Sequence, residues 1–321
     1  MNFDLDQEHR ELAGAAGEFL SASASPAAAR AALEDGAALR PGRAELVKSG
    51  YATITVPASG GTVLQQAVVA EQAGRVLAGP SLVSFARAAV LLDGDPDRLA
   101  GLADGSLAVA VVDDGGPVLD AIGADTFLAL RDRALVCGPG TVTAREPIDP
   151  TRGLGDVALG ATTVLARDAA ERWRRAERVG RAILAAEGLG AAARLLELSV
   201  EYAKQRHAFG RAIGSYQAVK HLLVDVYVEV EQLRSLVWWA AWAAGRAPGE
   251  LPLAAAAAKA AAATTLELAA ETAIQVHGGI GFTWEHDAHL YWRRAKVDRF
   301  LLGDDVAAFD EVARLAMGQV T

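Results

Sequence analysis

The second half of the chain is dominated by long stretches in which apolar residues recur with helical spacing. Three of them run from Ala169 to Arg206, from Tyr216 to Ala244 and from Pro252 to His277, and a shorter one covers about 303–317. Long amphipathic helices need partners to bury their apolar faces. We therefore predict a C-terminal bundle of four helices over residues 168–321. In the second stretch the apolar face consists of Leu222, Leu223, Val226, Val230, Leu233 and Val237.

Two local features qualify this bundle. Gly188 and Gly190 lie inside the first stretch, and because glycine weakens a helix interior they predict an interruption there. Trp238, Trp239 and Trp242 cluster in the second stretch, and such side chains suit either a core or a subunit interface.

Residues 1–105 carry helical patterns as well, and we predict an N-terminal helical domain. Asp4 or Asp6 can cap the first helix, and Pro26 can open the second. The predicted helices end near Ser21, run from Pro26 to about Leu39, from Val63 to Val76, and from Ser81 to Leu92.

Residues 106–167 differ in character. They contain short runs of β-forming residues, such as Thr141 to Thr143, separated by turns rich in Asp, Gly and Pro. This spacing predicts a reduced antiparallel β domain of about five strands. The expected fold class is therefore mainly α with one small β domain.

Composition excludes several classes of function. The chain has 321 residues, 52% of them hydrophobic, which predicts a globular protein. A net charge of −9 disfavours nucleic acid as a partner. Cys137 is the one cysteine, so there is no disulfide framework and no cysteine-based metal cluster. His286 and His289 are three residues apart, but a lone pair of histidines without further ligands does not predict a metal site.

The expected localisation rests on two kinds of segment that the sequence lacks. The acidic N-terminus is unlike a secretory or transit peptide. No apolar run reaches the roughly 18 residues of a membrane span without a charge, since the Ala-rich run 253–266 contains Lys259. We expect a cytoplasmic protein without a membrane span.

The segment from Gln275 to Gly303 combines glycines with aromatic and cationic residues. Gly278, Gly279 and Gly281 leave the backbone accessible at the end of a predicted helix. The glycines can simply cap that helix, or they can form a loop that faces a phosphate or cofactor. A dinucleotide fingerprint is excluded, because that motif follows a strand. The aromatic and charged residues after them are Phe282, Trp284, His286, His289, Tyr291, Trp292, Arg293 and Arg294.

Two motifs together resemble the acyl-CoA dehydrogenase family. They are R-H-A-F-G-R-A-I-G-S-Y-Q-A-V-K-H at 206–221 and Q-V-H-G-G-I-G-F at 275–282. The segment S-G-Y-A-T-I-T-V-P-A-S-G-G at 49–61, with Glu71 and Gly74 after it, resembles the N-terminal domain of that family. The short length is similar to compact actinobacterial members, several of which work as heteromeric pairs on steroid or other bulky acyl-CoAs.

The resemblance implies an FAD site shared between subunits. Arg206 and Phe209 would face the pyrophosphate and adenine, and Gln217 would hold the adenosine part. A guanidinium suits a pyrophosphate because it offers planar, charged donors, although Arg206 could instead pair with Glu201. The residues that would hold FAD bound mainly to the neighbouring subunit are Gln275, Gly278 and Gly279.

Arg181 matches the family's helix arginine beside the acyl-CoA, and a solvated helix face is the alternative. Just before it lie four more arginines. They could attract a CoA phosphate or balance Glu171 and Glu177 through pairs three residues apart. These arginines are Arg172, Arg174, Arg175 and Arg178.

The family's reaction needs a carboxylate to remove the proton α to the thioester, and neither usual position has one. Those positions are Leu302 and Gly180. Asp304 and its neighbour Asp305 lie near the first position, but they can instead cap the last helix. Glu187 lies nearly two turns beyond Arg181 but points roughly 120° away round the helix, and an ion pair inside the bundle is the alternative.

The β domain also departs from the family's pattern. Only a dozen residues separate Val112 from Asp125, and they lack the threonine and tryptophan segment that wraps the flavin ring in the family.

The resemblance implies a flavoprotein of lipid metabolism that desaturates an acyl-CoA thioester. This chain would complete the FAD site of a base-bearing partner, in a homo- or hetero-oligomer such as a dimer of dimers.

Three alternatives remain open from the sequence. The chain could be a self-sufficient dehydrogenase with a relocated base. It could be a purely structural subunit that has lost redox chemistry. It could also keep the fold and perform a non-redox tailoring reaction in a biosynthetic pathway.

Overall fold

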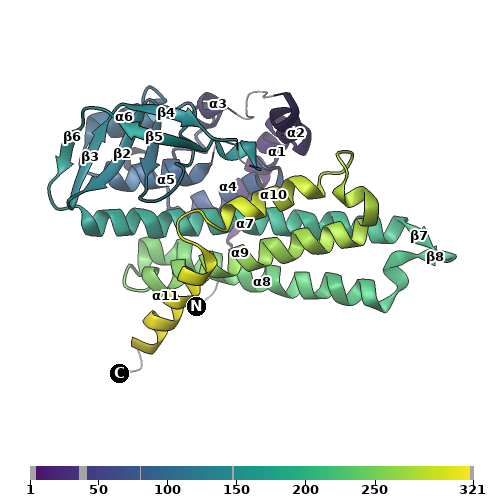
Figure 1. Cartoon of the computed structure of the whole chain (residues 1–321). Helices are drawn as coiled ribbons and strands as arrows, with labels where there is room; N and C mark the ends of the chain where they lie inside the picture. Colours follow the sequence, from purple (N-terminus) through teal and green to yellow (C-terminus); the bar gives the residue numbers. More distant parts are fainter. Residues whose placement is uncertain (1–4, 36–41, 80, 147, 319–321) are drawn as a thin grey trace.

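The computed structural model describes residues 5–35, 42–79, 81–146 and 148–318. Three long antiparallel helices form its centre, with the N-terminal helices and the β-sheets on one side of α7 (Figure 1). The C-terminal helices are α7 (Ala170–Gln205), α8 (Gln217–Arg246), α9 (Leu251–His277), α10 (Ala288–Asp298) and α11 (Asp305–Gly318). The bundle is the predicted one, with α10 as an addition.

In the described residues before the sheets, the chain is helical. Asp6 caps α1 by accepting a hydrogen bond from His9 N at 3.0 Å, which confirms one of the two predicted caps. Asp4 and the predicted end of the second helix at Leu39 lie outside the described residues. The helices are α1 (Gln7–Ser23), α2 (Pro26–Asp35), α3 (Arg43–Lys48), α4 (Val63–Arg75), α5 (Leu82–Leu91) and α6 (Pro96–Asp104).

The expected break in α7 does not occur, because its glycines serve the packing against neighbouring helices. A Cβ at Gly190 would stand 1.8 Å from the carbonyl oxygen of Glu71 on α4, and a Cβ at Gly74 would stand 1.8 Å from that of Glu187 on α7. The two glycines therefore allow the backbones of α4 and α7 to touch. At Gly188 a Cβ would meet only Ala262, at an ordinary 3.5 Å.

The middle of the chain forms two small sheets. The larger has the strand order β1-β2-β3-β6 and the smaller pairs β4 with β5. We predicted antiparallel pairing throughout, but β1 and β2 run parallel. The connection between them makes this possible, because it leaves the sheet and pairs Val118 with Gly155 before returning. The strands are β1 (Val109–Val112), β2 (Thr126–Arg131), β3 (Ala134–Gly138), β4 (Gly140–Ala144), β5 (Gly155–Leu159) and β6 (Thr163–Ala166).

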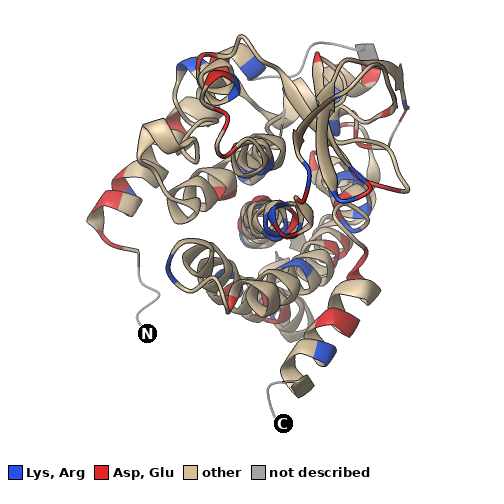
Figure 2. Ribbon diagram, turned by 90° about the vertical axis from the view of Figure 1, so that its left-hand side faces the viewer, with Lys and Arg blue, Asp and Glu red and all other residues tan. Residues whose placement is uncertain are grey.

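Two apolar clusters hold these layers together. The smaller one fills the space between the two sheets around Phe127, and the larger one joins the N-terminal helices to α7, α8 and α9. Trp238 is buried in the larger cluster, and Trp239 and Trp242 pack against it. Figure 2 shows acidic and basic residues interspersed along the bundle helices.

The helical run Leu251–Phe282 has the length and mean hydropathy of a membrane span, but 67% of its apolar window is buried inside the protein. In the bundle α9 lies between α7 and α8 and also contacts α10 and α11. Its apolar character therefore belongs to a core helix.

Candidate functional site

A cavity of about 540 Å³ lies between the β1–β2 connection and the α10–α11 connection. Most of its wall is apolar, and charged groups line its rim. The apolar residues that line it include Leu119, Ile148, Leu154, Val297, Phe300, Leu301 and Leu302.

The aspartates of this cavity are already bonded within the chain. Asp113 accepts two hydrogen bonds from the Arg87 guanidinium, both at 2.6 Å. Asp114 pairs with Arg131 at 3.1 Å. Asp304 caps α11 by accepting a hydrogen bond from Ala307 N at 2.7 Å. The cavity therefore suits a neutral, largely apolar group.

Gly180 and Leu302, the two positions at which the resemblance predicts a base, lie together at the edge of this cavity. A Cβ at Gly180 would stand 2.9 Å from Leu302 Cδ1 and 2.7 Å from Arg87 Cδ. Gly180 therefore lies under the Leu302 side chain, with the Arg87 stem beside it. Leu302 has a left-handed φ of 59°, so the loop that presents it is tightly constrained. The sequence predicted two separate empty positions, and the structure brings them into one place.

Arg181 holds the same loop. Its Nε donates to the carbonyl oxygen of Leu302 at 2.9 Å. Its two terminal nitrogens pair with Glu311 of α11 at 2.5 Å and with Glu177 at 2.7 Å. The Arg181 guanidinium is therefore neither solvated nor free, because all three of its nitrogens are bonded inside the chain. Its predicted contact with an acyl-CoA stays a prediction.

Glu187 lies on another side of α7, in a buried network. One carboxylate oxygen accepts hydrogen bonds from Ser81 Oγ at 2.9 Å and Leu82 N at 3.2 Å. The other pairs with Arg152 at 2.5 Å, and Arg152 also binds Asp298. Every oxygen of Glu187 is therefore committed to a structural partner, as the ion-pair alternative anticipated.

This network joins the sheets to the bundle. Arg294 of α10 pairs with Asp149 at 2.5 Å, while Lys259 of α9 donates to the carbonyl oxygens of Asp298 and Arg299. Burial lowers the pKa of Lys259 to about 8, and burial raises the pKa of Asp298. The partners of this network could not be predicted from the sequence, because they are 35 or more positions apart and no local pattern links them.

A second region lies at the far end of the bundle, where α7 ends in a small hairpin (Figure 1). Its strands are β7 (His207–Ala208) and β8 (Arg211–Ala212). Phe209 at its tip is 97% exposed and has a φ of 53°. The Arg206 side chain is exposed and has no hydrogen bond or ion pair within the described part of the chain, so the predicted pair with Glu201 is absent there. Gln217 is exposed at the start of α8.

The glycine loop lies at the same end of the bundle. Gly278 has a φ of 65°, and a Cβ at Gly278 or Gly279 would meet nothing within 4 Å. Gly279 is therefore not required by packing inside this chain. The rings of Tyr202 on α7 and His277 on α9 lie 4.4 Å apart, which fixes the loop beside the hairpin end of α7. Gln275 is exposed on the last turn of α9.

The chemistry of this region suits a flat, anionic group. It offers an unpaired guanidinium, an exposed aromatic ring and backbone that no side chain covers. In contrast, each aspartate that lines the apolar cavity in the described part of the chain already has a partner. The two regions therefore differ in chemistry, with unpaired donors at the hairpin end of the bundle and bonded carboxylates at the apolar cavity.

Comparison with known proteins identifies the family of the chain. Residues 174–317 match the family model described as acyl-CoA dehydrogenase, C-terminal domain. Over 302 residues the chain is 35% identical to acyl-CoA dehydrogenase IpdE2 of Mycobacterium tuberculosis, covering 90% of this chain and 91% of that protein. The chain belongs to the acyl-CoA dehydrogenase family. FAD is the cofactor of this family.

Solved structures of family members share the whole fold. The Tcur3481-Tcur3483 steroid ACAD G363A variant has a TM-score of 0.86 and 25% identity, covering 98% of this chain and 99% of that chain. The ChsE4-ChsE5 complex from Mycobacterium tuberculosis has a TM-score of 0.84 and 26% identity, covering 98% of both chains. The acyl-CoA dehydrogenase fold predicted from the two motifs is thus confirmed.

Proposed function

We propose that this chain is the subunit of an acyl-CoA dehydrogenase pair that completes the FAD site of a base-bearing partner. One observation carries the proposal: Gly180 and Leu302 occupy both usual base positions and lie against each other. The nearest other carboxylates are bonded elsewhere, so a base would have to come from another chain. When bound, FAD supplies the hydride acceptor for α,β-desaturation of an acyl-CoA thioester.

The far end of the bundle supports the cofactor role. Arg206 would pair with the FAD pyrophosphate, and Phe209 would lie against the adenine. Gln217 would hold the adenosine part. The loop of Gln275, Gly278 and Gly279 would hold FAD bound mainly to the neighbouring subunit. These side chains are exposed in the single chain, as residues that await a partner should be.

Two similar structures support a heteromeric assembly. One carries a two-component name, Tcur3481-Tcur3483, and the other is the ChsE4-ChsE5 complex. By analogy this chain would assemble with a different family member and act on an acyl-CoA. The apolar cavity of this chain, the subunit that would lack the base, is consistent with the binding of a bulky acyl group.

A relocated base is the main alternative, and the bonding of the cavity's carboxylates argues against it. Asp113 is held by a bidentate arginine contact and Asp304 by the α11 cap. Removing either from its partner would cost free energy before any proton could be taken. The alternative of a purely structural subunit is tested by the same experiment as the main proposal.

The test is co-expression with a family member that carries the base, followed by measurement of bound flavin. The chain alone should purify colourless, and the pair should purify yellow. Arg206→Ala in the pair should reduce FAD retention about tenfold or more, which corresponds to the loss of one charged hydrogen bond. Arg133→Ala is the matched control, since Arg133 is 70% exposed and paired with Asp168 on the sheet. Equal retention in both variants would remove the pyrophosphate assignment.

A further inference from the structure

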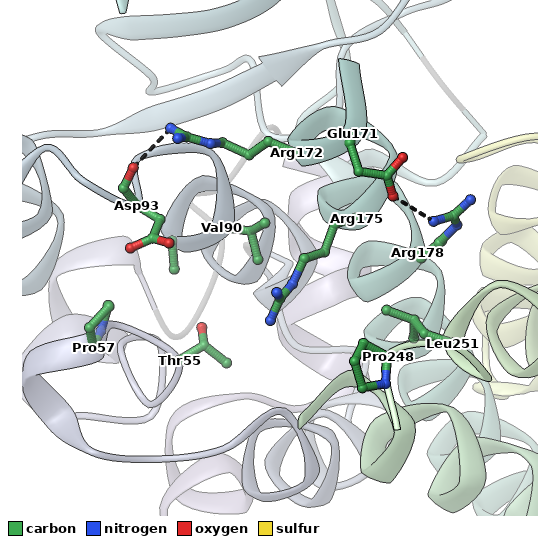
Figure 3. Close-up of a pocket in the computed structure, with 11 residues that line it drawn as sticks. Thr55, Pro57, Val90, Asp93, Glu171, Arg172, Arg175, Arg178, Pro248 and Leu251 are labelled. Atoms are coloured by element: carbon green, nitrogen blue, oxygen red, sulfur yellow. Dashed lines mark hydrogen bonds and ion pairs between the residues drawn. The ribbon is translucent and has the colours of Figure 1, made fainter. Parts of the chain in front are cut away.

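We propose that a second cavity, at the opposite end of α7 from the hairpin, binds a phosphate-bearing anion. The cavity has a volume of about 450 Å³ and lies between the C-terminal end of α5, the first turns of α7 and the α8–α9 connection (Figure 3). None of its lining residues belongs to the apolar cavity described above. They are Thr55, Pro57, Ala89, Val90, Asp93, Glu171, Arg172, Arg175, Arg178, Pro248 and Leu251.

Three arginines of this cavity come from one face of α7, because they are three residues apart. Two of them are fixed. Arg172 donates to the carbonyl oxygen of Asp93 at 2.8 Å and so covers the end of α5. Arg178 pairs with Glu171 at 3.2 Å. The third, Arg175, has no hydrogen bond or ion pair within residues 5–35, 42–79, 81–146 and 148–318.

The Arg175 side chain extends from α7 into the cavity, toward the side where Thr55 lies (Figure 3). Thr55 Oγ1 is buried and has no hydrogen-bond partner within the described chain. A buried hydroxyl without a partner costs free energy unless a ligand or water satisfies it. The cavity therefore combines an unpaired cation with an unsatisfied hydroxyl, and both can bind the oxygens of one anion.

The carboxylates at the rim do not neutralise this combination. Glu171 is already shared by Arg174 and Arg178, at 2.7 and 3.2 Å. Asp93 also lines the cavity, so three lining arginines stand against two lining carboxylates. The lining thus retains an excess of positive charge around Arg175, which favours an anion over a neutral ligand.

A phosphate group matches these donors best. A guanidinium can bind two phosphate oxygens with parallel N–H groups, and the threonine hydroxyl can bind a third. The volume lies in the range of small-molecule sites and exceeds what a bare ion needs. A phosphate with an organic substituent, such as a nucleotide, would therefore fit better than inorganic phosphate. This inference does not depend on the proposed pairing with a base-bearing subunit.

Isothermal titration of the full chain at low ionic strength tests the site, with inorganic phosphate, ADP, CoA and dephospho-CoA as probes. Arg175→Ala should weaken binding at least tenfold, and Thr55→Val should weaken it about threefold. Arg145→Ala is the control, because Arg145 is also exposed, pairs with Asp156 on the sheet and does not line the cavity. Arg175 is exposed as well, so its removal should leave the unfolding temperature unchanged.

The four probes identify the source of the phosphate. Binding of CoA but not of dephospho-CoA would assign the site to the CoA 3′-phosphate. Equal binding of ADP and CoA, and weaker binding of inorganic phosphate, would support a nucleotide phosphate in general. Binding of inorganic phosphate alone would still support a phosphate site. The proposal is overturned if no probe binds at 10 mM (roughly the weakest affinity of interest), or if Arg175→Ala and Arg145→Ala bind equally well.

Discussion

Leu302 Cδ1 lies 2.9 Å from the point where a Cβ of Gly180 would stand. These are the two positions at which the resemblance predicts a catalytic carboxylate, and they are neighbours across the contact of α7 with the α10–α11 connection. Both carry apolar residues in this chain, so neither position supplies a carboxylate to the cavity.

The contact between α4 and α7 predicts a sharp contrast between two glycines of one helix. Gly190→Ala should destabilise the chain by more than about 3 kcal/mol, because its Cβ would overlap the Glu71 carbonyl. Gly188→Ala should be neutral or stabilise it by up to about 1 kcal/mol, since helix propensity improves and the contact with Ala262 is ordinary. Urea denaturation of both variants measures this difference. Similar losses in the two variants would contradict the close approach of α4 and α7.

Glu187→Gln separates a structural role from a catalytic one. Arg152 is fully buried and would lose its ion pair with Glu187 while keeping the one with Asp298, so we expect a loss of about 3 kcal/mol in stability. Any dehydrogenase activity of the assembled pair, measured at a temperature where the variant is folded, should be unchanged. Glu177→Gln is the control, because Glu177 is 32% exposed and its loss should cost less than about 1 kcal/mol. Lost activity at full stability would instead identify Glu187 as a relocated base.

His289, which follows the glycine loop in the sequence, predicts a loss of folding stability in mild acid. Burial lowers the pKa of His289 to about 4, with Arg293 and Arg30 adding to the effect and Asp287 opposing it. A histidine whose folded pKa lies below its unfolded value of roughly 6.5 destabilises the fold as pH falls between the two values. We expect stability to decrease from pH 6.5 to 4 by up to about 3 kcal/mol, and His289→Gln to reduce this slope. A flat profile over that range would show that His289 titrates normally.

Phe209 should matter for binding and not for folding. Its ring is 97% exposed, so Phe209→Ala should change the stability of the single chain by less than about 0.5 kcal/mol. The same change should weaken FAD retention or assembly in the pair, because an aromatic ring at a boundary contributes about 1 kcal/mol or more. Phe300→Ala is a control with 69% exposure at the other site. An unaffected pair would leave the ring without a role.

Much of the helical framework could be predicted from the sequence. The predicted stretch from Pro252 to His277 corresponds to α9 (Leu251–His277), and Ser81 does precede α5 as its cap. The break at Gly188 and Gly190 was wrong, because contacts with α4 and α9 outweigh the low helix propensity of glycine. The parallel pairing of β1 with β2 also escaped prediction, since it depends on a connection that leaves the sheet.

The candidate site could be predicted from the sequence only at residues that belong to short motifs. The glycine loop and Arg206 were predicted in this way, and both are exposed in the structure. Their contact with FAD stays a prediction. The contact of Gly180 with Leu302 joins residues more than 100 positions apart and has no local pattern. The Arg152 network is hidden for the same reason, because charged residues in a sequence do not reveal whether their partners are buried.

Reduction of flavin by an acyl-CoA under anaerobic conditions tests the central claim most directly. The chain should be supplied with excess FAD and an acyl-CoA, first alone and then with its base-bearing partner. We expect no bleaching of the flavin absorbance from the chain alone, and bleaching when the partner is present. The bleaching should disappear when the partner's base is replaced by glutamine and should persist in Glu187→Gln of this chain. Bleaching by the chain alone would contradict the account, because it would require a base that the pocket of Gly180 and Leu302 does not contain.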